Sequence, residues 1–273
     1  MIRGLMHHLL LSLRLNGRNP QALVFGYAVP LFFLVAFASV FGRTGTQIQA
    51  ELGKVLTIAI LGSACFGLPI GLVSERERGI WRRYRVTPIG LPRVLLSTLA
   101  ARFVLMLSSG ALVLTVAVWA YAMPWPERWG ELLLAYSAAS IAFIGVGLVI
   151  ATLADSVSAV QALGQCLFLP MLMIGGIAVP LRMLPEWAQQ AAWYMPGRYA
   201  VTALDHALLP SLHLTRAWWP LLALLLCAAS GTLAALSAPR WDEQPLTRRV
   251  QLRAVVIAVA GWVAIGLISQ ASR

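Results

Sequence analysis

The chain has 273 residues, of which 59% are hydrophobic and only 11% are charged, and its mean hydropathy is +0.78. Soluble domains carry about 25% charged residues, so this composition excludes a water-soluble globular protein. A net charge of +11 would suit nucleic-acid binding, but in so apolar a chain the basic residues are better explained by membrane topology. The sequence therefore indicates an all-α polytopic membrane protein without a nucleic-acid partner.

Seven apolar stretches account for most of the chain. A bilayer core about 30 Å thick requires about 20 helical residues to cross it. The stretches lie at 21–41, 55–73, 103–123, 132–154, 157–180, 217–238 and 254–268. The first six are long enough to span, whereas the seventh reaches that length only if residues 250–252 join it across Arg253. We therefore predict six transmembrane helices and a seventh, C-terminal one.

Lys and Arg are unevenly distributed between alternate connections. If the N-terminus is cytoplasmic, segments 1–20, 74–102, 155–156 and 239–253 hold 14 Lys and Arg in 66 residues, against 7 in 62 on the opposite side. The positive-inside rule therefore predicts a cytoplasmic N-terminus. Seven of the ten tryptophans lie at or beyond the outer ends of the spans, which indicates an interfacial belt and an outer cap: Trp119, Trp125, Trp129, Trp187, Trp193, Trp218 and Trp219.

Residues 1–20 are predicted to form an amphipathic helix at the membrane surface. On a helical wheel Arg3, His7, Arg14 and Arg18 fall within an arc of about 60°, beside an apolar face. Such a helix lies in the headgroup region and contacts membrane lipids. Its polar face either serves only as an anchor or also contacts a cytoplasmic partner.

The loop at 74–93, between the second and third spans, combines charges with exposed aromatic residues. Arg and Trp are favoured anchors in protein interfaces, so a short helix here would suit docking on a soluble protein. We expect Ser74 and the following acids to begin this helix and Gly79 to permit a bend. The candidate docking residues are Glu75, Arg76, Glu77, Arg78, Gly79, Trp81, Arg82, Arg83 and Tyr84. The plain alternative is a basic loop that only fixes orientation.

These residues carry a family resemblance. Residues 75–79, followed by Arg82-Arg83 and by 86–88, resemble the type-2 ATP-binding-cassette exporter permeases, in their drug- and lipid-exporting branch. Residues 175–180, 184–187 and 196–200 are similar to the glycine-rich fifth span, the outer re-entrant helices and the Pro-x-x-Tyr-Ala segment of the same family. The resemblance covers about residues 1–238.

The resemblance implies a permease subunit of a bacterial inner-membrane exporter, with residues 21–238 as its six-span domain. Two copies, or one copy and a sibling permease, would pair on separate ATPase subunits that bind ATP and Mg. Residues 75–86 would be the coupling helix, and 181–216 a re-entrant cap that includes Pro185, Trp187, Pro196 and Tyr199 and follows Pro180. The family has six spans with both ends in the cytoplasm, so residues 239–273, a basic linker and an extra helix, depart from it.

Two other function classes, an ion-coupled carrier and a membrane-embedded enzyme, are alternatives to a transporter driven by a partner. The only lysine, Lys54, lies in no G-x-x-x-x-G-K-[ST] motif, so we expect no nucleotide or other cofactor on this chain. An ion-coupled carrier places acids or histidines deep in its spans, and the sequence places none in the middle of one; Arg102 is expected to snorkel. A lipid-modifying enzyme would need more than Asp205-His206, which we expect to be a solvated or hydrogen-bonded loop feature.

The translocation path is the least specified part of the sequence. Gln161 and Gln165 lie one turn apart on the fifth span, so they share a face and either pair across a subunit contact or touch cargo. Small residues, including Gly145, Gly175 and Gly176, permit close helix approach. An uncharged path rimmed by tryptophan favours an amphiphilic cargo such as a drug, a lipid or a lipid-linked glycan.

Overall fold

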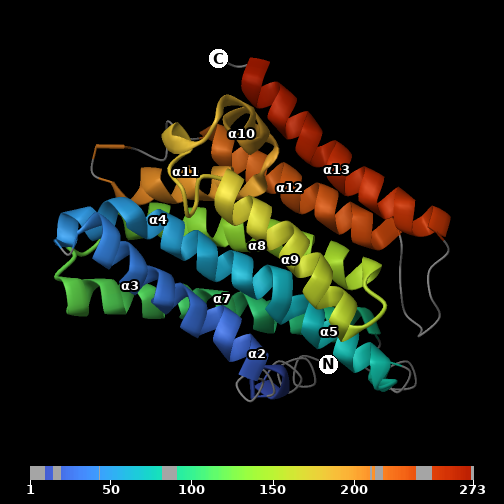
Figure 1. Cartoon of the computed structure of the whole chain (residues 1–273). Helices are drawn as coiled ribbons and strands as arrows, with labels where there is room; N and C mark the ends of the chain where they lie inside the picture. Colours follow the sequence, from blue (N-terminus) through green and yellow to red (C-terminus); the bar gives the residue numbers. More distant parts are fainter. Residues whose placement is uncertain are drawn as a thin grey trace.

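The computed structural model describes residues 10–14, 20–42, 44–81, 91–209, 211–212, 218–237 and 248–271. Throughout these ranges the regular structure is helical, and seven helical stretches are long and apolar enough to cross a membrane (Figure 1). They are Val24–Phe41, Gly45–Glu77, Pro92–Tyr121, Trp129–Leu153, Val157–Ile174, Trp218–Ser237 and Arg249–Gln270. The predicted all-α, multi-pass fold is confirmed.

The spans are built from labelled elements. The first comprises α2 (Pro20–Leu23), the π-helix η1 (Val24–Ala28) and α3 (Val29–Phe41), and the second comprises α4 (Gly45–Gly62), the π-helix η2 (Ser63–Gly67) and α5 (Leu68–Glu77). The others are α7 (Leu91–Tyr121), α8 (Trp129–Leu153), α9 (Val157–Ile174), α12 (Trp218–Ser237) and α13 (Arg248–Ala271). Four short helices follow α9, namely η3 (Leu181–Met183), α10 (Glu186–Ala191), η4 (Ala192–Tyr194) and α11 (Pro196–Leu208).

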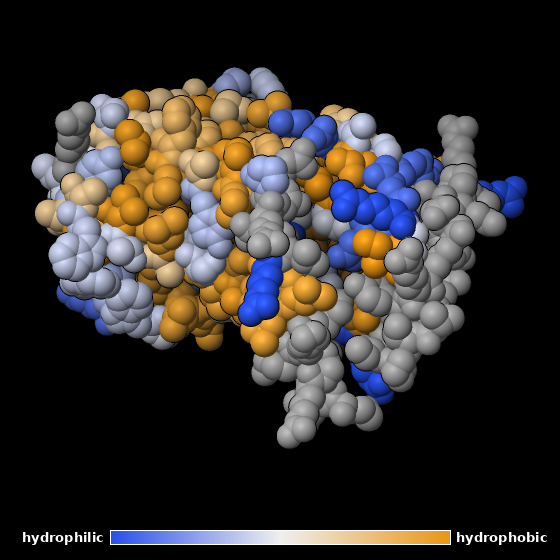
Figure 2. Space-filling view, turned by 90° about the horizontal axis from the view of Figure 1, so that it is seen from below, coloured by the Kyte–Doolittle hydropathy of each residue, from blue (hydrophilic) through white to orange (hydrophobic). Residues whose placement is uncertain are grey.

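The bundle has two distinct ends (Figure 1). The basic end carries the C-terminus of α5, the connection between α8 and α9 at 154–156, and the first residues of α7 and α13. The cap end carries α10, η4, α11 and the last residues of α13. In Figure 2 apolar side chains cover much of the visible face, and the most hydrophilic ones gather toward the basic end. This pattern fits a belt of apolar spans between polar ends.

The second span is much longer than predicted. Its helix begins at Gly45, after a capping box formed by Thr44 and Gln47, so residues 45–54 are helical where an outer loop was expected. At the other end Glu75 and Glu77 belong to the last turns of α5, so the prediction that they begin a new helix is wrong. The span window is 94% buried. This helix is surrounded by other helices rather than by lipid, so it tolerates polar residues. A prediction based on uninterrupted apolar residues leaves these polar residues out of the span.

The two π-helices meet in the core. The rings of Phe25 in η1 and Phe66 in η2 stack with centroids 4.1 Å apart. A π-helix disturbs the regular i→i−4 ladder, and α7 supplies donors to carbonyls at both sites. Arg102 donates from Nη2 to the Gly67 carbonyl at 2.6 Å, and Ser109 donates to the Gly26 carbonyl. Arg102 is only 4% exposed, so the prediction that it snorkels toward water is wrong.

The fifth and seventh spans have boundaries that differ from the predicted ones. Residues 250–252 do join the seventh helix, because α13 runs without interruption from Arg248 and packs on α12, α8 and η4. The fifth span ends six residues earlier than predicted, at Ile174. Gly175 caps it, and Gly176 has φ +77°, a left-handed conformation that favours glycine.

Candidate functional site

At the basic end, the predicted docking segment is tied to two other spans. Arg76 is buried, at 6% exposure, and donates from Nη1 to the Ala151 carbonyl at 3.1 Å and from Nη2 to the Ala154 carbonyl at 2.5 Å. These acceptors are among the last carbonyls of α8 and its C-cap, which lack partners within the helix. A guanidinium from the second span therefore caps the fourth.

The acids of the same segment make further contacts. The Glu77 carboxylate accepts from the backbone N–H of Val157 at 3.2 Å, at the positive N-terminus of α9. Trp81 donates from Nε1 to Glu75 at 3.3 Å, which folds residues 80–81 back on α5 after the turn at Arg78 and Gly79. Gly79 has φ +66°, so the predicted bend at this glycine is confirmed. The end of α5 is thus joined to the α8–α9 connection.

Several predicted site residues lie outside the described part of the chain. These are Arg82, Arg83 and Tyr84 in the docking segment and Arg3, His7 and Arg18 in the N-terminal segment. Arg14 is described: it lies in the helical stretch 10–14 and is exposed.

The fifth span presents two of the candidate path residues on its surface. Gln161 and Gln165 are both exposed, on one face of α9. Gly175 and Gly176 are instead buried, and a Cβ at Gly176 would lie 2.8 Å from Leu181 Cγ. The two glycines therefore shape the tight turn between α9 and the cap.

The cap begins after that turn and returns into the bundle. Pro180 and Pro185 are the N-caps of η3 and α10, and Trp187 is 65% exposed. Pro196 begins α11, and Tyr199 donates from its hydroxyl to the Trp193 carbonyl at 2.7 Å. Because α11 packs against α4, α8 and α12, this segment returns into the bundle; that it re-enters the membrane stays a prediction.

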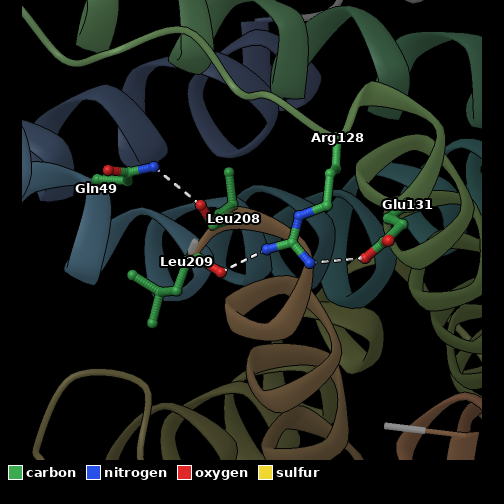
Figure 3. A network of polar contacts seen from close by, with 5 residues as sticks. All are labelled: Gln49, Arg128, Glu131, Leu208 and Leu209. Atoms are coloured by element: carbon green, nitrogen blue, oxygen red, sulfur yellow. Dashed lines mark hydrogen bonds and ion pairs between the residues drawn. The ribbon is translucent and has the colours of Figure 1, made fainter. Parts of the chain in front are cut away.

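Side chains from the ends of other spans hold the C-terminus of α11 (Figure 3). Gln49 of α4 donates to the Leu208 carbonyl at 2.9 Å, and Arg128 donates to the Leu209 carbonyl at 2.5 Å. Arg128 also pairs with Glu131 at 3.2 Å, which orients its guanidinium. These contacts satisfy terminal carbonyls of α11 and fix its position. Gln49 was not singled out by sequence, since it lies in residues expected to be a loop.

Asp205, expected to be a loop residue, lies within α11 and faces α4. Its Oδ1 atom is buried with no hydrogen-bond partner in the described structure, and it occupies the space that a Cβ at Gly53 would fill. The Lys54–Glu51 ion pair, at 2.6 Å, lies on the facing helix. Burial raises the pKa of Asp205 to about 7, against the attraction of Lys54 and helped by the repulsion of Glu51. Nothing in the sequence spacing reveals this contact, because 151 positions separate Lys54 from Asp205.

This arrangement defines a multi-pass helical membrane protein in which side chains from other helices hold the cap helix α11 in position. A family model described as ABC-2 type transporter matches residues 11–209, and the chain belongs to this family. The match ends before α12 and α13.

Curated relatives agree with the family. The chain is 26% identical over 173 residues to proteins described as "Probable multidrug ABC transporter permease YbhR" from Escherichia coli strain K12 and from Escherichia coli O157:H7. Each match covers 60% of this chain and 45% of the relative, so the chain matches less than half the length of these proteins. No solved structure gives a significant match.

Proposed function

We propose that this chain is the membrane-spanning permease subunit of an ATP-binding-cassette exporter in the bacterial inner membrane. Its N-terminus lies in the cytoplasm, and a separate ATPase subunit binds ATP and Mg and supplies the energy. The cargo is an amphiphile, namely a drug, a lipid or a lipid-linked glycan. Family membership supports this proposal, as does the description of its relatives as probable multidrug permeases. The chain itself carries out no covalent chemistry.

The observation that carries the proposal is the bonding at the end of α5. Arg76 and Glu77 connect the second span to the end of α8 and the start of α9. A push on residues 78–86 would therefore move three spans together rather than bend one loop. Such a connection suits a segment that receives movement from a soluble subunit. Arg76 is buried, so its role in this proposal is to transmit the movement, while Arg82 and Arg83 make the contact.

A second copy of the permease is proposed to pack against α9. Gln161 and Gln165 expose amide groups on a largely apolar membrane-spanning helix. Amides in a bilayer gain from a partner helix that satisfies their hydrogen bonds. The partner is either an identical chain or a sibling permease.

The proposed coupling is tested by charge reversal. The double variant Arg82→Glu/Arg83→Glu, expressed with its ATPase, should lose about tenfold or more of ethidium efflux, because like charges replace complementary ones at the contact. Basal ATP hydrolysis by the assembled or released ATPase should continue. Arg253→Glu, a reversal at an exposed position of α13 at the same end, is the matched control and should transport normally. Undiminished efflux by the double variant would show that the coupling segment is assigned wrongly.

Asp205 gives the ion-coupled carrier a specific observation in its favour. A buried acid that titrates near neutral pH is a feature of proton-coupled transport. It lies, however, in the cap helix α11 and not in any of the seven spans. A proton-coupled carrier would stop when a protonophore collapses the proton gradient while ATP is maintained. The ATP-driven exporter proposed here would continue.

A further inference from the structure

An open cavity lies where the cap meets the end of the seventh helix. Its volume is about 640 Å³, and its described lining consists of Trp187, Gln190, Ala191, Trp193, Tyr194 and Gln270. In Figure 1 α10 lies beside the C-terminal part of α13, and η4 contacts α13 directly. Small-molecule sites occupy about 300–1,000 Å³, so the cavity is large enough for a ligand of one or two rings.

Four of the lining residues lie on one face of the continuous helical segment formed by α10 and η4. Since η4 continues directly from α10, Trp187, Gln190, Ala191 and Tyr194 fall at positions i, i+3, i+4 and i+7, on the same side of the helix. Gln270, from α13, also lines the cavity. The cavity is therefore walled by the cap on one side and by a helix beyond the family match on the other.

Two of the three aromatic rings of the cavity, those of Trp193 and Tyr194, are held in place before any ligand binds. The Arg198 guanidinium lies 3.5 Å from the centroid of the Trp193 ring, and the Trp193 carbonyl accepts the Tyr199 hydroxyl. A Cβ at Gly266 would lie 2.4 Å from the Tyr194 ring, so this ring rests against the bare backbone of α13. Rings fixed in this way pay little conformational entropy on binding.

The chemistry of the lining selects a neutral ring that carries hydroxyl groups. Aromatic faces stack against the C–H-bearing face of a sugar, and the amides of Gln190 and Gln270 both donate and accept hydrogen bonds, as sugar hydroxyls require. None of the six described lining residues is charged, and the guanidinium on Trp193 disfavours a cationic ligand. We propose that this cavity binds a hexose ring of a neutral glycan, presented either by a glycolipid headgroup or by a free oligosaccharide.

The proposal differs from an ordinary interfacial belt, in which single tryptophans lie among lipid headgroups. Trp218 is such a residue: it is 64% exposed, almost as exposed as Trp187, and it does not line the cavity. It therefore provides a control that removes the same ring from the same end of the bundle.

The test is saturation-transfer NMR on the full chain in phosphatidylcholine nanodiscs. The probes are soluble neutral oligosaccharides of glucose, galactose, mannose and N-acetylglucosamine. At least one should receive saturation, and its signal should fall about fivefold or more in Trp187→Ala and in Gln270→Leu, which remove a stacking face and an amide. Trp218→Ala should leave the signal unchanged. Two variants on different helices guard against misfolding of either one, and unchanged melting temperatures confirm folding.

Further arms separate the sources and define failure. Nanodiscs that contain a monoglucosyl lipid should displace the bound sugar if the ligand is a headgroup, and should leave it bound if the ligand is a free glycan. No saturation of any sugar, equal signals in Trp187→Ala and the parent, or saturation of a choline probe in preference to sugar would each overturn the proposal. The assay needs neither ATPase nor transport, so its failure would leave the proposed exporter function standing, and the reverse also holds.

Discussion

Asp205 shows how one side chain links the cap to the bundle. Its buried Oδ1 packs against Gly53, and the charges of Lys54 and Glu51 on α4 act on the carboxyl group. His206, the next residue of α11, is a further titratable side chain. Without a hydrogen-bond partner in the described structure, the ionised carboxylate is destabilised by burial. The neutral acid is therefore the form that favours close packing of α11 on α4.

This burial predicts a pH-dependent stability. The pKa rises from 3.8 to about 7 in the folded chain, so between these values the unfolded state loses the proton that the folded state retains. The free energy of unfolding should therefore fall as pH rises from 4 to 7 and level off above 7. Asp205→Asn, which cannot ionise, should be the more stable protein at pH 8, by about 1–3 kcal/mol.

Thermal unfolding of the parent and Asp205→Asn in nanodiscs between pH 4 and pH 8 measures this difference. Glu127→Gln, at an exposed acid in the connection between α7 and α8, is the control and should follow the parent. Parallel pH profiles for the parent and Asp205→Asn would contradict the assignment of the effect to Asp205.

Pairs of helices approach closely wherever glycines face each other. The most extensive helix contact in the described structure joins α8 and α12, and there Gly145 and Gly231 lie backbone to backbone. A Cβ at Gly231 would lie 2.7 Å from the Gly145 carbonyl carbon. The predicted close approach at Gly145 is confirmed, and its partner lies on the sixth span.

Gly231→Ala should consequently destabilise the bundle by about 1–3 kcal/mol, since backbone atoms cannot yield as a side chain can. Gly130→Ala provides the comparison: it also adds one methyl to a helix, and nothing lies within 4 Å of that site. It should be neutral or slightly stabilising, because alanine has the higher helix propensity. Chemical denaturation of both variants in mixed micelles measures their free energies of unfolding. Equal stabilities would show that the close contact carries little energy.

At the scale of the whole molecule, α13 decides on which side of the membrane the chain ends. The helix is continuous, packs along α12, and reaches the cap end, where Gly266 contacts Tyr194. An odd number of spans places the two termini on opposite sides of the bilayer.

Reporter fusions test this topology. Alkaline phosphatase, which is active only outside the cytoplasm, should be active when fused after residue 273 and inactive when fused after residue 247. A green fluorescent protein fusion at the same two points should give the opposite pattern. Activity after residue 247 would mean that the orientation predicted from the basic loops is wrong, and inactivity after 273 would mean that α13 does not span.

Membrane spans are visible in a sequence because they depend on local composition. About twenty apolar residues in a row are enough to cross a bilayer, so the number of spans could be predicted before any packing was known. The bend at Gly79 could be predicted as well, because glycine adopts a left-handed conformation readily. The candidate docking segment and the cap segment were predicted in the same way, since each lies within a short continuous stretch.

Tertiary structure decided where the polar groups go. Arg76 and Arg102 are buried, and Asp205 has a buried carboxylate oxygen. The two arginines bond to carbonyls of residues 35 or more positions away in the sequence. From composition alone, each of these polar side chains is expected to lie near water, because burying it is unfavourable. In the bundle, however, a π-helix or a helix end provides carbonyl groups that need hydrogen-bond donors. Those acceptors exist only after the helices have packed, and for this physical reason the sequence could specify the spans but not the contacts that join them.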